Sequence, residues 1–269
     1  MISNARHAPN VNIARVARRG GKVDMGKYAN ILSFGAGVNS VALAIMAIND
    51  GWRGEIVFAD TGCEWPETMC YMDYFEEWLS QFGLTINRIS NTTYKSGLSL
   101  IDYCEYARII PLAAIRWCTV EYKVKPGLAW AAGRSQMIGI AADEAWRQPD
   151  AIRPLVDAGI SREGCIEIIQ AEGLDVPQKS GCYICPNQSN SQWYELWRRH
   201  PDLFERAARL EDSAVRNARQ KGHRSVNAVL DPHGKITLRQ RELAYESQMP
   251  LPEIDMDELL RFKPCMCTV

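Results

Sequence analysis

The amino-acid sequence predicts an α/β fold, with a doubly wound, mostly parallel sheet followed by a helical part that contains cysteines. Two observations predict it. In the first half, short apolar runs alternate with helical patterns, and this spacing is typical of strand–helix–strand units with helices on both faces of a sheet. In the second half, helical patterns dominate and are interrupted by a cysteine-containing loop.

The first half supplies the expected sheet. Its four strands are expected in the apolar runs ANILSF, EIVFAD, LTINRIS and QMIGIA. Helices are expected between them at 38–50, 66–82 and 119–132. Ligands of such sheets bind at the carboxyl ends of the strands. We therefore expect three loops to meet at one edge, at 33–40, 60–66 and 139–147.

The second half is expected to contain further helices. Ser161 is a candidate N-cap for a short helix at 162–172, although Gly164 stands where a capping box needs Glu or Gln. Pro201 is expected to divide the long helical pattern that follows, because proline interrupts a helix. A last helix is expected at 255–261.

Composition indicates an ordinary globular chain of 269 residues, 46% of them hydrophobic and 23% charged. No run of 18 apolar residues predicts a membrane span, and no apolar segment near the N-terminus predicts a secretory signal. A cytoplasmic location without membrane association is therefore expected. Residues 1–28 hold six Lys or Arg and one acid, which is typical of an arm that contacts nucleic acid or of a solvated terminus.

The stretch SFGAGVNS joins the first expected strand to the first expected helix. Gly35, Ala36 and Gly37 form its turn, and Asn39 and Ser40 lie in the first helical turn. Glycine allows positive φ and close backbone approach, and a helix N-terminus favours anions, so the turn is a candidate phosphate cradle. It matches neither the Walker pattern nor the Rossmann fingerprint. A plain strand–helix turn is the alternative interpretation.

This stretch resembles the PP-loop of the adenine nucleotide α-hydrolase-like superfamily, with Gly35 in place of a usual Ser and Asn39 in place of a usual Asp. Two later stretches, VFADTGCEWPET and IGIAADEAWR, resemble signatures of the phosphoadenosine phosphosulfate reductase family. The resemblance spans roughly residues 29–200. It implies a nucleotide site formed by Ser33, Gly35, Ala36, Gly37, Val38, Asn39, Ser40, Asp60, Thr61, Gly139, Asp143, Glu144 and Arg147.

Two of these residues carry alternative interpretations. Asp60 is expected near the ribose or a metal ion such as Mg²⁺, or else to be a capping carboxylate. Arg147 is expected to pair with an anionic group of the substrate, or else to form a surface ion pair. The resemblance divides the chain into a basic arm (1–28), a nucleotide-binding α/β domain (29–150) and a helical region with a C-x-x-C loop and a cysteine tail (151–269).

Nine cysteines predict metal binding or redox chemistry in a reducing compartment. Family members with an iron–sulfur cluster, expected here as 4Fe-4S, have a Cys-Cys pair followed by Lys, Pro and a C-x-x-C. Cys118, Cys182 and Cys185 match that set, whereas Thr119 replaces the second cysteine of the pair. Cys165 is the first candidate for the missing ligand, or else a buried thiol, and an open iron site is another alternative.

The tail holds Cys265 and Cys267, which are candidates for the catalytic thiol because family reductases carry their nucleophile near the C-terminus. The expected activity is reduction of an adenylyl sulfate to sulfite, with a thiol electron donor such as thioredoxin. The uncharged Asn39 favours it slightly. The alternative is an ATP-dependent sulfurtransferase that thiolates tRNA or DNA, which the basic arm and Thr119 favour. A third is a noncatalytic nucleotide-binding module with a structural zinc on Cys182, Cys185 and the tail cysteines.

Overall fold

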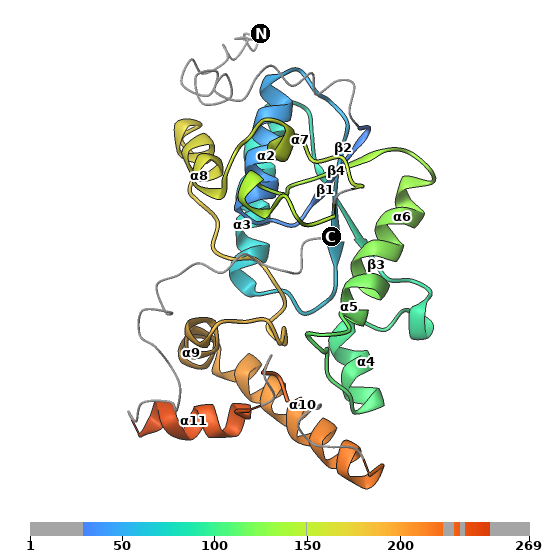
Figure 1. Ribbon diagram of the computed structural model, residues 1–269, viewed down its shortest axis with the longest axis vertical. Helices are drawn as coiled ribbons and strands as arrows, with labels where there is room; N and C mark the ends of the chain where they lie inside the picture. Colours follow the sequence, from blue (N-terminus) through green and yellow to red (C-terminus); the bar gives the residue numbers. More distant parts are fainter. Residues whose placement is uncertain (1–28, 149, 223–228, 232–234, 248–269) are drawn as a thin grey trace.

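The computed structural model describes residues 29–148, 150–222, 229–231 and 235–247 (Figure 1). These residues form an α/β fold in which a parallel sheet of four strands alternates with helices and a helical part follows. The expected fold class is therefore confirmed. Within the described ranges, no helix combines the length and the apolar character that crossing a bilayer requires. The basic arm, the tail cysteines and the expected helix at 255–261 lie outside these ranges.

The strand order is β3-β2-β1-β4, and all pairings are parallel. The strands are β1 (Ile31–Phe34), β2 (Glu55–Asp60), β3 (Ile86–Ser90) and β4 (Gln136–Ile138). Each lies within one of the four predicted apolar runs. The central strand β1 pairs on both sides, with Ile31 opposite Glu55 on one side and Gln136 on the other. The carboxyl ends of all four strands consequently point to one edge.

One face of the sheet is covered by α2 (Val38–Asn49) and α3 (Pro66–Ser80), and α8 (Arg162–Ala171) packs against α2 (Figure 1). Because α2 lies between the sheet and α8, it is buried from Val38 to Ile48, which explains why its sequence is apolar on every side. Ser161 caps α8 as predicted, since its Oγ accepts the Gly164 N–H at 3.2 Å.

The opposite face carries the expected helix 119–132, which the structure divides. It consists of α5 (Trp117–Thr119), the π-helical turn η4 (Val120–Val124) and α6 (Lys125–Ala131). Pro126 explains the widened turn, because its missing N–H cannot donate to the carbonyl four residues earlier. Ala131 of α6 packs with Ile31 and Val57 on this face. The helices thus cover both faces, although unequally.

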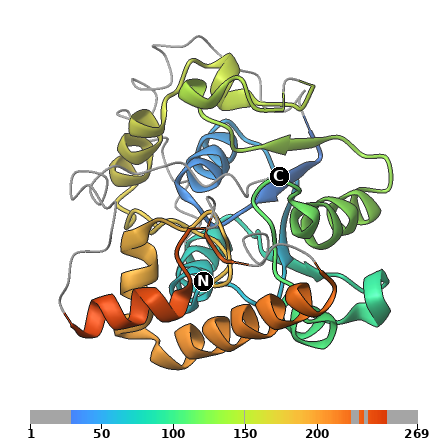
Figure 2. The same cartoon turned by 60° about the horizontal axis from the view of Figure 1, so that its bottom comes forward.

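The remaining helices build a second core beyond the sheet, at the lower end of the molecule in Figure 1 and in front in Figure 2. They are α4 (Leu100–Ala107), α9 (Asn190–Arg199), α10 (Pro201–Gln220) and α11 (Leu238–Glu246). The predicted break at Pro201 is confirmed. Three short helical segments complete the described part, namely η3 (Tyr94–Gly97), η5 (Ala142–Glu144) and α7 (Pro154–Asp157).

Candidate nucleotide site and cysteine cluster

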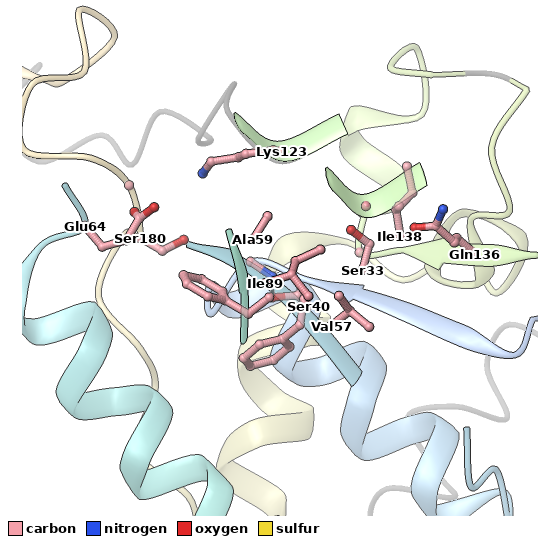
Figure 3. A pocket seen from close by; sticks show the side chains of 16 residues that line it. Ser33, Ser40, Val57, Ala59, Glu64, Ile89, Lys123, Gln136, Ile138 and Ser180 are labelled. Atoms are coloured by element: carbon pink, nitrogen blue, oxygen red, sulfur yellow. Dashed lines mark hydrogen bonds between the residues drawn. The ribbon is translucent and has the colours of Figure 1, made fainter. Parts of the chain in front are cut away.

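A pocket opens at the carboxyl edge of the sheet, where the sequence predicts ligand binding (Figure 3). Counted with its open mouth, it holds about 690 Å³. Every strand contributes to its wall, and so do the π-helical turn, α6 and the loop before the C-x-x-C. The described lining residues are Ser33, Phe34, Gly35, Ser40, Val57, Phe58, Ala59, Glu64, Ile89, Lys123, Gly127, Gln136, Ile138, Gly139, Ser180 and Gly181.

The Ser40 hydroxyl stabilises the glycine turn through hydrogen bonds to its backbone. Its Oγ accepts the N–H groups of Gly35 at 3.3 Å and Gly37 at 3.2 Å, and donates to the Gly37 carbonyl at 3.0 Å. The left-handed conformation that the sequence assigns to a glycine is adopted by Ala36, with φ of 52°. Ala36 is nevertheless buried, at 1% exposure. Neither Gly35 nor Gly37 has a positive φ, so the need for glycine at 37 is one of space.

That space is needed at two glycines. A Cβ on Gly37 would lie 2.9 Å from the Ser180 Oγ. A Cβ on Gly139, at the end of β4, would lie 2.7 Å from the backbone nitrogen of Ser40 and 2.9 Å from the carbonyl carbon of Asn39. Gly139 therefore lets the third loop press directly against the first turn of α2, which brings two of the three expected loops together at the pocket.

Two polar side chains of the third loop (139–147), Glu144 and Arg147, form contacts inside the protein, together with Asn39 of α2. The Asn39 Nδ2 donates to Glu144 at 3.2 Å, and the Arg147 guanidinium pairs with the same carboxylate at 3.0 Å. All three residues are buried, and Arg147 is 7% exposed. An internal carboxylate therefore already binds Arg147, and a further contact with a substrate anion stays a prediction. The expected surface ion pair is wrong, because the pair is buried.

The side chains of Asp60 and Asp143 both accept hydrogen bonds from backbone N–H groups. Asp143 accepts the N–H of Arg162 at 3.0 Å, in the first turn of α8. Asp60 accepts the N–H of Gly62 at 2.7 Å, in the turn after β2. Both side chains hold loops, and neither is among the described pocket-lining residues. Their contact with a nucleotide stays a prediction. For Asp60, the loop contact is in a turn rather than at the helix cap considered above.

The Thr61 hydroxyl contacts two cysteine sulfurs. Its Oγ1 lies 3.2 Å from the Cys63 Sγ and 3.1 Å from the Cys182 Sγ, and it donates to Glu64 at 2.8 Å. Glu64 in turn lines the pocket and accepts from the Cys182 thiol at 3.8 Å. Thr61 and Glu64 therefore connect the pocket to the cysteines.

Five cysteines belong to the second core, and we call them the cysteine cluster: Cys63, Cys104, Cys118, Cys182 and Cys185. They come from three stretches that are far apart in the sequence and from helix α4. All are free thiols. The three predicted cluster ligands thus share one core, in which Cys118 is near enough to Cys182 for their charges to interact and Cys185 follows Cys182 in the same turn. Two cysteines for which the sequence offered no motif belong to the same core.

Burial governs the acidity of these thiols. It raises the pKa of Cys63 well above its ordinary value, with nearby Cys182 adding to the effect. It also raises the pKa of Cys118, where Cys182 acts in the same direction and Lys123 acts against it. The pKa of Cys104 is raised by burial and by Cys118 and Cys182. Without a bound cation, Cys63, Cys104 and Cys118 are therefore protonated thiols at neutral pH.

Cys165 does not join them, and its assignment as the missing ligand is corrected. It is fully buried in the first core, on the face of α8 that carries Ile168 and Ile169 toward α2. Burial there raises its pKa to about 12. The alternative interpretation, a small buried thiol, describes it.

Lys123 lines the pocket, although the sequence motifs assigned it no role in the nucleotide site. Among the described lining residues it alone carries a cationic side chain, which extends over the pocket in Figure 3. The sequence feature that could have identified it is its position five residues after Cys118, which matches the Lys of the resembling family. Glu64, Gln136 and Ser180 also line the pocket, although no motif marked their side chains.

In the described part of the chain, no three His, Cys, Asp or Glu side chains gather tightly enough to hold a single metal ion. Thiolates on one zinc ion lie about 2.3 Å from it, and hence within about 4 Å of one another. The predicted zinc site would also need Cys265 and Cys267, which lie outside the described residues.

The three-motif resemblance has no counterpart in the comparisons with known proteins. No protein-family model matches this chain, and no curated protein matches it.

Proposed function

We propose that this chain is an adenine nucleotide-binding enzyme of sulfur chemistry that reduces an adenylyl sulfate to sulfite. One observation carries the proposal. The same pocket is lined by the glycine turn, through Gly35 and Ser40, and by the segment that leads into the C-x-x-C, through Ser180 and Gly181. A nucleotide held there would lie beside the cysteine cluster.

The pocket offers complementary surfaces to such a nucleotide. Its apolar wall, which includes Phe34, Ile89 and Ile138, suits a base. The N-terminus of α2 and the Lys123 ammonium provide the positive potential that phosphate and sulfate groups need. The glycine turn allows their oxygens to approach the backbone closely. The Glu64 carboxylate lies toward the cysteines and is a candidate ligand for a Mg²⁺ that accompanies ATP.

In the proposed reaction, a thiolate of Cys265 or Cys267 attacks the sulfur atom of the adenylyl sulfate. A sulfur–sulfur bond forms, the sulfur–oxygen bond to the phosphate breaks, and the nucleotide leaves with that oxygen and its electron pair. A dithiol donor such as thioredoxin then reduces the enzyme thiosulfonate. Its two electrons release sulfite and restore the thiol, while the donor becomes a disulfide. We place this chemistry in the cytoplasm, where thiols stay reduced.

The donor set fits an iron–sulfur cluster better than a single ion. Cys118, Cys182 and Cys185 supply soft thiolates from one core, and a cluster distributes its ligands over several iron atoms, so they need not converge as on zinc. When bound, such a cluster would supply a redox-capable or sulfur-carrying centre beside the pocket. The Lys123 charge, which opposes the rise in the Cys118 pKa, also favours a thiolate ligand there.

A second candidate is an ATP-dependent sulfurtransferase that acts on tRNA or DNA. Thr119 favours it, because this buried residue stands where the resemblance expects another cysteine, which would leave one iron without a ligand from that position. The basic residues at 1–28, which suit nucleic acid, also favour it.

The two candidates differ in their products. Anaerobically purified full-length protein should be incubated with adenylyl sulfates plus a dithiol, and separately with ATP. The reductase is expected to release sulfite and AMP, or the 3′-phosphorylated nucleotide, without pyrophosphate. A chain truncated after Pro264 should bind nucleotide but release no sulfite. Pyrophosphate and AMP from ATP, with no sulfite from either sulfonucleotide, would replace the reductase with the sulfurtransferase.

A further inference from the structure

The cysteine cluster contains a thiol that the sequence motifs leave unassigned and that lies beside a predicted ligand. The sulfurs of Cys63 and Cys182 approach the same hydroxyl, at 3.2 and 3.1 Å from the Thr61 Oγ1. Cys63 is 1% exposed and Cys182 is 8% exposed. Two soft donor atoms are therefore brought close together away from solvent.

The backbone fixes this proximity. The N–H of Tyr183 donates to the Cys63 carbonyl at 2.8 Å, and the N–H of Trp65 donates to the Gly181 carbonyl at 3.1 Å. Between these bonds, Glu64 pairs with Cys182 in an antiparallel bridge. The segment after β2 is thus hydrogen-bonded to the C-x-x-C loop along its length, so Cys63 keeps its place relative to Cys182.

We infer that Cys63 is the fourth protein ligand of the iron–sulfur cluster that Cys118, Cys182 and Cys185 would hold. The inference rests on the cluster in the proposed function and completes its ligand set from a position that no cysteine motif marks. Its chemistry is that of the other three, since a thiolate is the usual ligand of iron in such clusters.

Cys104 is the competing thiol. It is also buried in this core, but it lies on helix α4, and its carbonyl accepts the N–H of Ile109, just after that helix, at 3.1 Å. Its position is therefore set by α4, whereas that of Cys63 is set by direct pairing with the C-x-x-C loop. Cys104 consequently provides a matched control, with the same residue type, core and burial.

The inference also bears on the reaction. A cluster with four thiolates has no iron atom left for an external sulfur, and one with three thiolates has such an atom. Cys63 as a ligand would therefore favour sulfonucleotide reduction over sulfur transfer, and it would compensate for Thr119 from another part of the chain.

The test uses the full-length protein, reconstituted anaerobically with iron and sulfide, and compares wild type with Cys63→Ala and Cys104→Ala. Iron and sulfide content, Mössbauer spectra and electron paramagnetic resonance after mild oxidation are the readouts. Wild type and Cys104→Ala are expected to keep a four-iron cluster. Cys63→Ala is expected to lose one iron and to show the resonance of a three-iron cluster.

Two results would overturn the inference, and they are distinguishable. If wild type binds no iron and sulfide, the cluster itself fails. If wild type is loaded and Cys63→Ala has the same iron content and spectra, only Cys63 fails as a ligand, and iron loss in Cys104→Ala instead would assign that thiol. Should Cys63→Ala not fold, Cys63→Ser keeps an oxygen donor. Its spectrum should then shift, whereas that of Cys104→Ser should not.

Discussion

The Asn39 amide donates a hydrogen bond of 3.2 Å to the Glu144 carboxylate, 105 residues further along the chain. This contact joins the first turn of α2 to the third loop of the pocket. It also gives a physical reason for Asn at this position, where the motif that this stretch resembles has Asp. A carboxylate at residue 39 would face another buried carboxylate, whereas an amide can donate to it.

We therefore predict that Asn39→Asp destabilises the protein at neutral pH. Loss of the donor to a buried acceptor costs roughly 1–3 kcal/mol, and repulsion between two carboxylates adds to this. Urea denaturation of wild type and Asn39→Asp at pH 7 measures the difference in the free energy of unfolding. Equal stability of wild type and Asn39→Asp at pH 7 would show that the contact does not hold the two segments together.

Gly139→Ala is predicted to destabilise the fold by roughly 1–3 kcal/mol, the usual cost of overpacking. Its new Cβ would lie 2.7 Å from the backbone of α2, which cannot move aside as a flexible side chain can. Gly127→Ala is the matched control, because Gly127 also lines the pocket but its Cβ would lie 3.7 Å from its nearest neighbour, Gln136. Thermal unfolding of the two variants is the measurement, and equal midpoints would refute the close approach.

The Glu211 carboxylate predicts a pH dependence of stability. It is buried and accepts the N–H groups of Leu230 and Leu238, each at 2.6 Å. Burial raises its pKa from 4.5 to about 7, against the opposing effect of these bonds. The folded chain therefore keeps this proton to a higher pH than the unfolded chain, so the free energy of unfolding falls between pH 4.5 and 7 and levels off above.

This shift corresponds to about 3 kcal/mol at most. Denaturant titrations of wild type and Glu211→Gln across that pH range isolate the contribution. The variant should lack this part of the slope, because its side chain does not titrate. Identical slopes for the two proteins would assign the pH dependence to other groups.

Lys123→Met is predicted to weaken binding of an adenine nucleotide by about tenfold to a hundredfold. The expectation follows from the loss of a charge-assisted hydrogen bond of about 1.5–3 kcal/mol. Lys125→Met is the control, since Lys125 is exposed, lies outside the described pocket lining and pairs with Glu121 at 2.6 Å. Calorimetric titration should separate the two, and equal affinities would remove Lys123 from the site.

Sequence patterns predicted the sheet well, because buried parallel strands are short apolar runs that differ plainly from the segments between them. Helix α11 was missed, although Thr237 and Gln240 form its capping box. Only Leu238 and Arg241 of this polar helix are buried, so its sequence lacks the hydrophobic periodicity that predicts a helix.

The site was predicted less completely, because motifs identify residues but not the direction of their side chains. Arg147 lies in a matching stretch yet faces Glu144, and Thr61 lies in another yet faces two thiols. Cys63 had no cysteine motif around it, and only the folded backbone brings it next to Cys182. Contacts between residues about 120 positions apart were not readable from local spacing.

The most direct measurement of the central claim is equilibrium binding of an adenylyl sulfate and of ATP to the anaerobic full-length protein and to Gly37→Val. The new Cβ would lie 2.9 Å from the pocket-lining Ser180 Oγ, and the branched side chain would close the approach to the turn. We predict that wild type binds at least one of these nucleotides and that Gly37→Val, unfolding near the wild-type temperature, binds it at least about tenfold more weakly, or about 1.4 kcal/mol. Unchanged affinity in a folded Gly37→Val protein, or no binding by wild type, would contradict the nucleotide site.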